Sequence, residues 1–252
     1  MNTLEKIIQA KHRRIGIQKL SNSFTDHYII SNTNIDKPRF FSHLNNCLKD
    51  YKIIAEMKKA SPSAGVIVND YKPEDLALEY QAKGYTNLSI LTEEDHFLGA
   101  ISHVAKVRKV SDLPILQKDF IVDEWQIYQA KTIGVDCILL ISEILTKEEI
   151  DSFIKTAKTL KLDVLLEFHD EIEIEKIKDL ELDYIGINNR NLRTLETDIN
   201  HCLLIRDKYH NELNNFKIIA ESGFKSKMEL ENYNSNGIEL FLIGESILKE
   251  KL

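Results

Sequence analysis

Eight short apolar runs, each followed by a stretch with helical spacing, organise most of this chain of 252 residues. They recur at intervals of roughly 20 to 35 residues, the length that a strand, a loop and a helix require together. The runs are continuous rather than alternating, which is typical of parallel strands covered on both faces. They occupy residues 53–56, 88–91, 115–118, 138–141, 164–167, 185–188, 218–221 and 241–244.

Amphipathic stretches separate these runs. One of them begins at Pro73, which suits a first helical turn, and stops before Gly84, which suits a helix end. An open doubly wound sheet also alternates strands and helices, but it carries a glycine-rich turn after its first strand, and this chain has none there. The pattern therefore predicts an α/β fold, a single (β/α)8 TIM barrel.

We expect one domain over residues 1–252, because the length is close to that of one such barrel and no Pro/Gly-rich linker divides the chain. Residues 1–50 are expected to form an N-terminal helical extension, and residues 51–252 the barrel.

The N-terminal extension contains two candidate helices. Leu4, Ile7 and Ile8 follow helical spacing, which predicts an amphipathic helix from residue 3 to about residue 17. A second helix is expected at about residues 40–48, after Pro38. Periodicity leaves open whether these helices cover the bottom of the barrel or its mouth.

Composition disfavours several classes of protein. The net charge of −7 argues against nucleic acid as the main partner, although local lysines could still bind an anionic substrate. Three widely spaced cysteines favour neither a metal site nor a disulfide framework. Glu5 and Lys6 argue against a signal peptide, and no apolar run reaches the roughly 18 residues that cross a bilayer. We expect a cytoplasmic protein without a membrane partner.

Polar and charged residues stand at the ends of several apolar runs. In a barrel the carboxyl ends of the strands ring one mouth, so these side chains should meet there. Charged groups at buried strand ends cost too much free energy to serve as packing residues. We therefore predict an active site that contains Glu56, Lys118, Glu167, Asn188 and Glu221.

The environment of these residues suggests their chemistry. Lys58 lies two residues after Glu56 and should share its side of the strand. Partial burial is expected to lower the pKa of Lys118 and suit proton donation, while nearby carboxylates would oppose the shift. Burial is expected to raise the pKa of Glu167 toward the range useful for an acid or base. A structural ion pair at Lys118 and a solvated turn around Lys58 are the alternatives.

The loops after the last two runs predict a phosphate site. Gly223 and Gly244 follow these runs, and glycine lets backbone N–H groups come close to a ligand. Ser222 adjoins the first of them. After the sixth run, Asn188 can bind a substrate hydroxyl, and Arg190 can hold a carboxylate or tie the mouth carboxylates together.

Taken together, these segments resemble the indole-3-glycerol-phosphate synthase family of tryptophan biosynthesis. The resemblance covers about residues 4–248 and rests on IIAEMKKASPSAGVI, SILTEEDHFLGA, PILQKDFIVDEWQI, LLEFHD, IGINNRNL, IAESGF and FLIGES. It implies a carboxy-lyase on a (β/α)8 barrel with an extra N-terminal helical segment and no cofactor or metal. The implied reaction closes the indole ring of 1-(2-carboxyphenylamino)-1-deoxyribulose 5-phosphate and releases CO2 and water.

The resemblance also implies roles for the mouth residues. Lys118 would be the general acid that protonates the ribulose carbonyl. Lys58 would hold the anthranilate carboxylate or share proton transfer in the later dehydration, in which Glu167 would also act. Glu56 would support the charge network.

Further positions would bind the substrate. Asn188 and Glu221 would bind the sugar hydroxyls and position the lysines. The phosphate site would comprise Ser61, Gly223, Gly244 and Glu245, and the aromatic-ring pocket Leu91, Phe97 and Leu139. Arg190 and Ser222 complete the expected substrate-binding set.

Two other functions fit the same barrel. A Schiff-base sugar-phosphate aldolase would use Lys118 or Lys58 as its nucleophile. A non-catalytic barrel would bind a sugar phosphate or a partner subunit without turnover. The Lys–Asp–Phe and Glu–Phe–His motifs speak against phosphoribosylanthranilate isomerase, which has a similar barrel. The expected partner is an anionic sugar-phosphate substrate, and the chain is expected to be a monomer.

Overall fold

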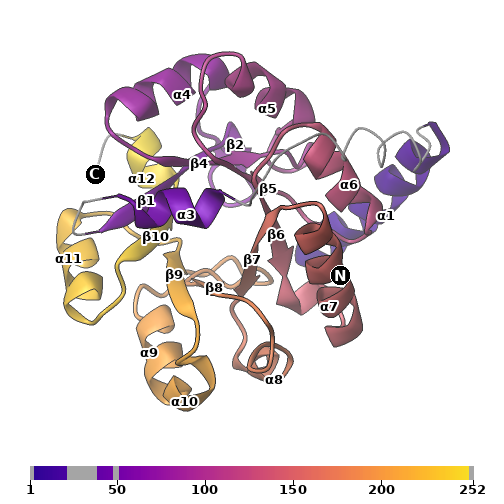
Figure 1. Cartoon of the computed structure of the whole chain (residues 1–252). Helices are drawn as coiled ribbons and strands as arrows, with labels where there is room; N and C mark the ends of the chain where they lie inside the picture. Colours follow the sequence, from indigo (N-terminus) through magenta and orange to yellow (C-terminus); the bar gives the residue numbers. More distant parts are fainter. Residues whose placement is uncertain (1–2, 22–38, 48–50, 250–252) are drawn as a thin grey trace.

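A computed structural model describes residues 3–21, 39–47 and 51–249 of the chain (Figure 1). Eight parallel strands form a closed barrel in the order β1-β10-β9-β8-β7-β6-β5-β4, and helices surround it. The predicted TIM barrel is confirmed. Its strands are β1 (Lys52–Met57), β4 (Asn87–Leu91), β5 (Ile115–Lys118), β6 (Cys137–Ile141), β7 (Asp163–Phe168), β8 (Tyr184–Asn188), β9 (Lys217–Glu221) and β10 (Leu240–Ile243).

The helices and short elements follow the predicted alternation. The helices that lie between or after the strands are α4 (Pro73–Ala82), α5 (Ile101–Arg108), α6 (Trp125–Thr132), α7 (Lys147–Thr159), α8 (Ile174–Ile177), α9 (His201–Lys208), α10 (His210–Leu213), α11 (Lys227–Ser235) and α12 (Glu245–Leu248). The 3-10 turns η1 (Ser142–Ile144) and η2 (Glu171–Glu173) follow β6 and β7. A small hairpin of β2 (Ala60–Ser61) and β3 (Gly65–Val66) follows β1.

Local sequence signals explain where helices begin. Pro73 opens α4, as predicted, because its fixed φ suits a first helical turn. Thr146 caps α7 by accepting a hydrogen bond from the backbone N–H of Glu149, whose side chain in turn accepts from the Thr146 N–H. Thr146 and Glu149 together form a capping box, which fixes the start of this helix on the outside of the barrel.

The strands divide their side chains between two apolar regions. In β6, Ile138 and Leu140 pack outward against the helices, while Cys137, Leu139 and Ile141 belong to the inner cluster. This alternation is the period of two that a strand imposes on its side chains. For the same reason, the residue two positions after an inward-facing core residue also points inward. In β5, for example, Leu116 belongs to the inner cluster, and Lys118 at the end of the strand faces the same way.

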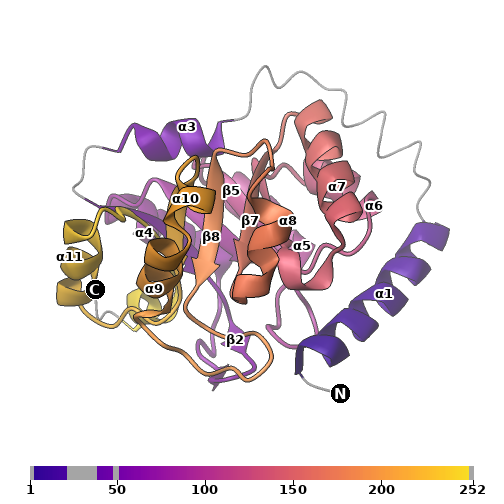
Figure 2. The ribbon, with the colours of Figure 1, turned by 90° about the horizontal axis from the view of Figure 1, so that it is seen from below.

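Helix α3 (Phe40–Asn45) closes the bottom of the barrel. The Phe40 carbonyl accepts a hydrogen bond from Asn87, the Phe40 N–H donates to Asp163, and the Phe41 ring stacks on Tyr184 at 3.8 Å. Asn87, Asp163 and Tyr184 are the first residues of their strands, so α3 covers the amino-terminal ends. Figure 2 shows it across one end of the barrel. Helix α3 ends at Asn45, earlier than predicted, and residues 38 and 48 lie outside the described residues.

Helix α1 (Thr3–Ser21) lies at the opposite end and is longer than predicted. In Figure 2 its first turn lies toward the end of the barrel where β2 is found. Leu4 and Ile7 are buried in the inner cluster. Periodicity left open whether the helices of the extension cover the bottom or the mouth of the barrel. The structure places α3 at the bottom and α1 at the mouth. Among the residues that the structure describes, no helix is long and apolar enough to span a bilayer.

Candidate active site

The carboxyl ends of the strands surround a cavity of about 430 Å³. Each of the eight strands contributes at least one residue to the wall of this cavity, and the loops just beyond the strand ends contribute more. Every predicted site residue lines this one cavity: Glu56, Lys58, Ser61, Leu91, Phe97, Lys118, Leu139, Glu167, Asn188, Arg190, Glu221, Ser222, Gly223, Gly244 and Glu245.

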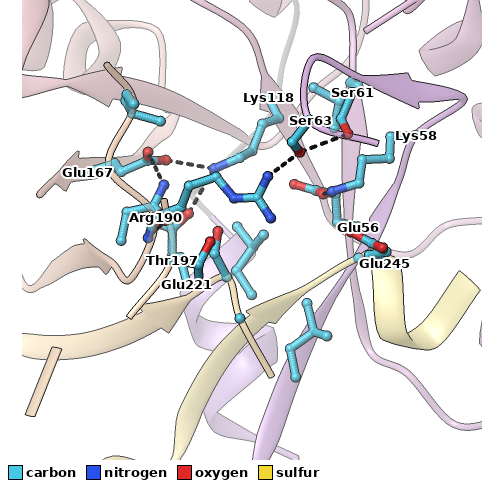
Figure 3. A pocket seen from close by; sticks show the side chains of 18 of the residues that line it. Glu56, Lys58, Ser61, Ser63, Lys118, Glu167, Arg190, Thr197, Glu221 and Glu245 are labelled. Atoms are coloured by element: carbon cyan, nitrogen blue, oxygen red, sulfur yellow. Dashed lines mark hydrogen bonds and ion pairs between the residues drawn. The ribbon is translucent and has the colours of Figure 1, made fainter. Parts of the chain in front are cut away.

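Lys118 lies at the centre of the polar side of the cavity. Its ammonium group is 2.6 Å from Glu167 Oε2 and 2.7 Å from Glu221 Oε2, and its side chain is 15% exposed (Figure 3). The strands β7 and β9 supply the two carboxylates, which approach the ammonium from different sides. Two charge-assisted hydrogen bonds therefore fix the position of this ammonium.

The pKa of Lys118 is raised, so the predicted lowering is wrong. Burial does lower the pKa of this ammonium, but the negative charges of Glu167, Glu221 and Glu56 more than offset that effect. Lys118 is therefore a fully charged donor at neutral pH rather than a neutral amine.

The two carboxylates differ in their partners. Glu167 Oε1 also accepts a hydrogen bond from the Asn188 amide at 2.7 Å, whereas none of the described residues donates to Glu221 Oε1. Burial raises the pKa of Glu167, but Lys118 and the Asn188 amide bring it below its usual value. Burial and the charge of Glu167 raise the pKa of Glu221 well above its usual value. The predicted rise at Glu167 is thus wrong, and Glu221 is the group that takes up a proton first.

Two glycines make room for carboxylates of the site. A Cβ atom at Gly186, in the middle of β8, would overlap Oε1 of Glu221. A Cβ atom at Gly244, just after β10, would overlap Oε1 of Glu56. Gly244 was predicted to admit a ligand, and its contact with Glu56 is a second reason for glycine at this position.

A second ammonium lies on the side of the mouth formed by β1. Lys58 Nζ is 2.5 Å from Glu56 Oε1. Arg190, beyond the end of β8, reaches across the mouth and donates to the hydroxyl of Ser63 in the β2–β3 hairpin (Figure 3). The guanidinium thus bridges two loops on opposite sides of the cavity.

The apolar side of the cavity contains residues that sequence reasoning missed. Phe120 and Ile141 lie two residues after Lys118 and Leu139, so strand parity could have identified them. Leu4 and Ile7 of α1 also line the cavity, and no sequence signal shows that this helix lies at the mouth. Within the described part of the chain, no group of three or more His, Cys, Asp and Glu side chains could hold a metal ion.

A buried lysine holds α1 at the mouth. Lys11 is 4% exposed, and its ammonium lies 2.7 Å from Asp119, the residue after Lys118, and 3.1 Å from Glu94. Lys19 on the same helix forms an exposed ion pair with Asp123 at 2.8 Å. Because buried pairs respond far more strongly than exposed ones to loss of a partner, Lys11 should dominate the attachment of α1.

We expect Lys11→Met to weaken substrate binding, whereas Lys19→Met should not. Loss of the buried ammonium leaves Asp119 without an ion-pair partner and Glu94 with only its longer pair to Arg14 at 3.6 Å, at a cost of about 3 kcal/mol. Release of α1 would also remove Leu4 and Ile7 from the cavity wall, which should raise KM about tenfold. Steady-state kinetics and thermal unfolding of both variants test this. Equal KM values for Lys11→Met and Lys19→Met would contradict it.

Comparisons with known proteins identify the family of the chain. A family model described as indole-3-glycerol phosphate synthase matches residues 4–251. The chain is 41% identical to the indole-3-glycerol phosphate synthase of Campylobacter fetus subsp. fetus (strain 82-40), over 92% of this chain and 86% of that protein. It is 36% identical to the enzyme of the same name from Endomicrobium trichonymphae, over 98% of this chain and 94% of that protein.

A solved structure supports the fold alone. The crystal structure of 3-hexulose-6-phosphate synthase superimposes with a TM-score of 0.60 at 13% identity, covering 80% of this chain and 97% of that one. The family model and the curated relatives go further, since each matches most of the chain. This chain belongs to the indole-3-glycerol phosphate synthase family.

Proposed function

We propose that this protein converts 1-(2-carboxyphenylamino)-1-deoxyribulose 5-phosphate to indole-3-glycerol phosphate, CO2 and water, in tryptophan biosynthesis. The observation that carries the proposal is the Lys118 ammonium between Glu167 and Glu221, inside a cavity with one apolar and one polar side. Ring closure needs a proton donor at the ketone oxygen, and a fixed ammonium supplies one.

In the first step, the ring carbon that bears the carboxylate attacks the ketone carbon. The new C–C bond turns the ketone oxygen into an alkoxide, which takes a proton from Lys118. The raised pKa of Lys118 keeps the group charged, so it can also stabilise the developing negative charge. Cleavage of the bond to the carboxylate then releases CO2, which a dry apolar pocket favours.

In the dehydration that follows, the hydroxyl formed from the ketone leaves as water, and the ring system loses a proton. Glu167, with a pKa below its usual value, is ionised at neutral pH and is the group we propose as the base. The leaving hydroxyl needs a proton, and Lys58, held by Glu56 at 2.5 Å, is the group we propose as its donor.

The remaining predicted residues divide between the two ends of the substrate. We propose that Leu91, Phe97 and Leu139 contact the aromatic ring and that Asn188 and Glu221 bind sugar hydroxyls. Phosphate binding at the far end would fix the reacting atoms in place. The proposed phosphate-binding residues are Ser61, Ser222, Gly223, Gly244 and Glu245, and Arg190 would close over the bound substrate.

We further propose that residues 1–252 act as one domain and as a monomer in the cytoplasm, because one chain supplies every residue named above. The net charge of −7 argues against nucleic acid as the partner, and the lysines of the cavity can still bind a small anionic substrate. The raised pKa of Lys118 disfavours this residue as the nucleophile of a Schiff-base aldolase, which must be a neutral amine.

The test is an assay of the purified chain with the carboxyphenylamino-deoxyribulose phosphate, following indole fluorescence without added metal or cofactor. Formation of indole-3-glycerol phosphate is the expected result. No product from a folded chain that still binds the substrate would favour the non-catalytic barrel. A covalent adduct trapped by borohydride with a keto-sugar phosphate would favour the aldolase.

A further inference from the structure

His169 lies just beyond β7, two residues after Glu167, and is not among the described residues that line the cavity. Its ring Nδ1 is 2.7 Å from the backbone carbonyl oxygen of Asn188. A carbonyl oxygen can only accept a hydrogen bond, so Nδ1 carries the proton and donates it. The ring therefore links the ends of β7 and β8.

This link lies where the backbone ladder between the two strands has ended. The last paired residues of β7 and β8 are Phe168 and Ile187. The imidazole takes the place of the next ladder bond and satisfies the carbonyl of Asn188, at the point where the strand turns into a loop. The β9 ladder holds one edge of the Asn188 backbone by pairing it with Glu221, whereas the edge that faces β7 depends on a side-chain donor.

The side chain of Asn188 in turn holds Glu167, the proposed base. Its amide donates to Glu167 Oε1 at 2.7 Å, and its amide oxygen accepts from the Arg190 N–H at 2.9 Å. The second contact fixes which way the amide points, so the N–H group faces Glu167. A shift of the Asn188 backbone would therefore move Glu167 relative to Lys118.

His169 is itself anchored from two other elements. Glu143 in η1 accepts hydrogen bonds from the N–H groups of His169 and Asp170, at 2.5 and 3.0 Å. His201, at the start of α9, donates from Nε2 to the His169 carbonyl at 2.8 Å and stacks on its ring at 4.0 Å. Anchors on both sides leave the imidazole little freedom, as a positioning group requires.

We propose that His169 is a positioning residue for the dehydration step, which it serves by holding Asn188 and, through it, Glu167. The proposal rests on the proposed function, because it assumes that Glu167 acts in that step. It assigns His169 no contact with the substrate. Loss of its donor should therefore lower kcat and leave KM almost unchanged, since a small misplacement of a reacting group slows chemistry more than binding.

The test compares His169→Leu with His169→Asn in the full chain. Leucine has no donor, whereas the amide nitrogen of asparagine lies close to where Nδ1 of histidine lies. We expect His169→Leu to lower kcat about tenfold with KM within about threefold, and His169→Asn to recover most of that loss. The control is His43→Leu, which replaces an exposed histidine of α3, at the end of the barrel opposite the cavity, and should keep the parent kcat.

A double substitution separates positioning from a general loss of structure. In an Asn188→Ala background the His169 bond no longer acts on Glu167, so His169→Leu should lower kcat by less than about twofold. If His169→Leu does not fold, His169→Ala takes its place with the same expectation.

Three results would overturn the inference: parent kcat in His169→Leu, equal loss in the leucine and asparagine variants, or full additivity with Asn188→Ala. If the parent chain makes no indole product, the proposed function fails instead. An active parent with an unaffected His169→Leu variant contradicts the role of His169 alone.

Discussion

Lys118→Ala should lower kcat by about 100-fold or more while the chain still folds, because a positioned proton donor contributes about that much to a rate. Lys118 is the ammonium between Glu167 and Glu221, and no other described ammonium contacts both carboxylates. The cost to folding should be limited, because the carboxylate pair can retain one proton when the lysine is absent. Single-turnover and steady-state rates with indole fluorescence measure the effect.

The matched control for this variant is Lys83→Ala. Lys83 also forms an ion pair, with Glu79 at 2.7 Å, but at the end of α4 and away from the cavity. It should keep the parent kcat, and thermal unfolding of both variants should show a folded chain. If Lys118→Ala retains activity within a few-fold of the parent, Lys118 is not the acid of the ring closure.

The location of the site could be predicted from the sequence because side chains alternate between the two faces of a strand. This alternation depends only on neighbouring residues in the sequence. Ile54 and Glu56, or Leu165 and Glu167, are two residues apart on buried strands, so a core residue fixes the direction of the strand end. The barrel then brings all these ends to one mouth. The apolar runs could therefore indicate both the fold and the charged residues of the cavity, before any distance was known.

The protonation of these groups could not be predicted in the same way. Lys118 and Glu221 are 103 positions apart in sequence but 2.7 Å apart in space, and their pKa values depend on that distance. Burial alone predicted a lowered pKa for Lys118 and a raised one for Glu167. Both directions were wrong because opposite charges at 2.6 to 2.7 Å outweigh the cost of burial.

The position of α1 at the mouth is a second feature that neighbouring residues in the sequence could not predict. Its apolar spacing shows one buried face, but both ends of a barrel offer an apolar surface to cover. The ion pairs of Lys11 with Asp119 and Glu94 select the mouth, and each joins residues far apart in the sequence. Contacts of this kind depend on the tertiary structure that they help to form.

Glu167→Gln should lower kcat about 100-fold with little change in KM, whereas Glu221→Gln should lower kcat by about tenfold or less. The physical reason is the difference in their protonation. Glu167 is ionised, so glutamine removes both the proposed base and a charge that holds Lys118. Glu221 takes up a proton first, so the neutral amide of glutamine resembles its protonated state and can still accept from Lys118 through its oxygen.

The two variants form a matched pair, since each changes one of two glutamates that contact the same ammonium. Their kcat and KM values, measured with the same substrate preparation, test the assignment of the base. A rise in KM with unchanged kcat in Glu167→Gln would make Glu167 a binding residue. A larger loss of kcat in Glu221→Gln than in Glu167→Gln would place the ionised base on β9 instead of β7. In that case the asymmetry created by the Asn188 amide would not control the chemistry.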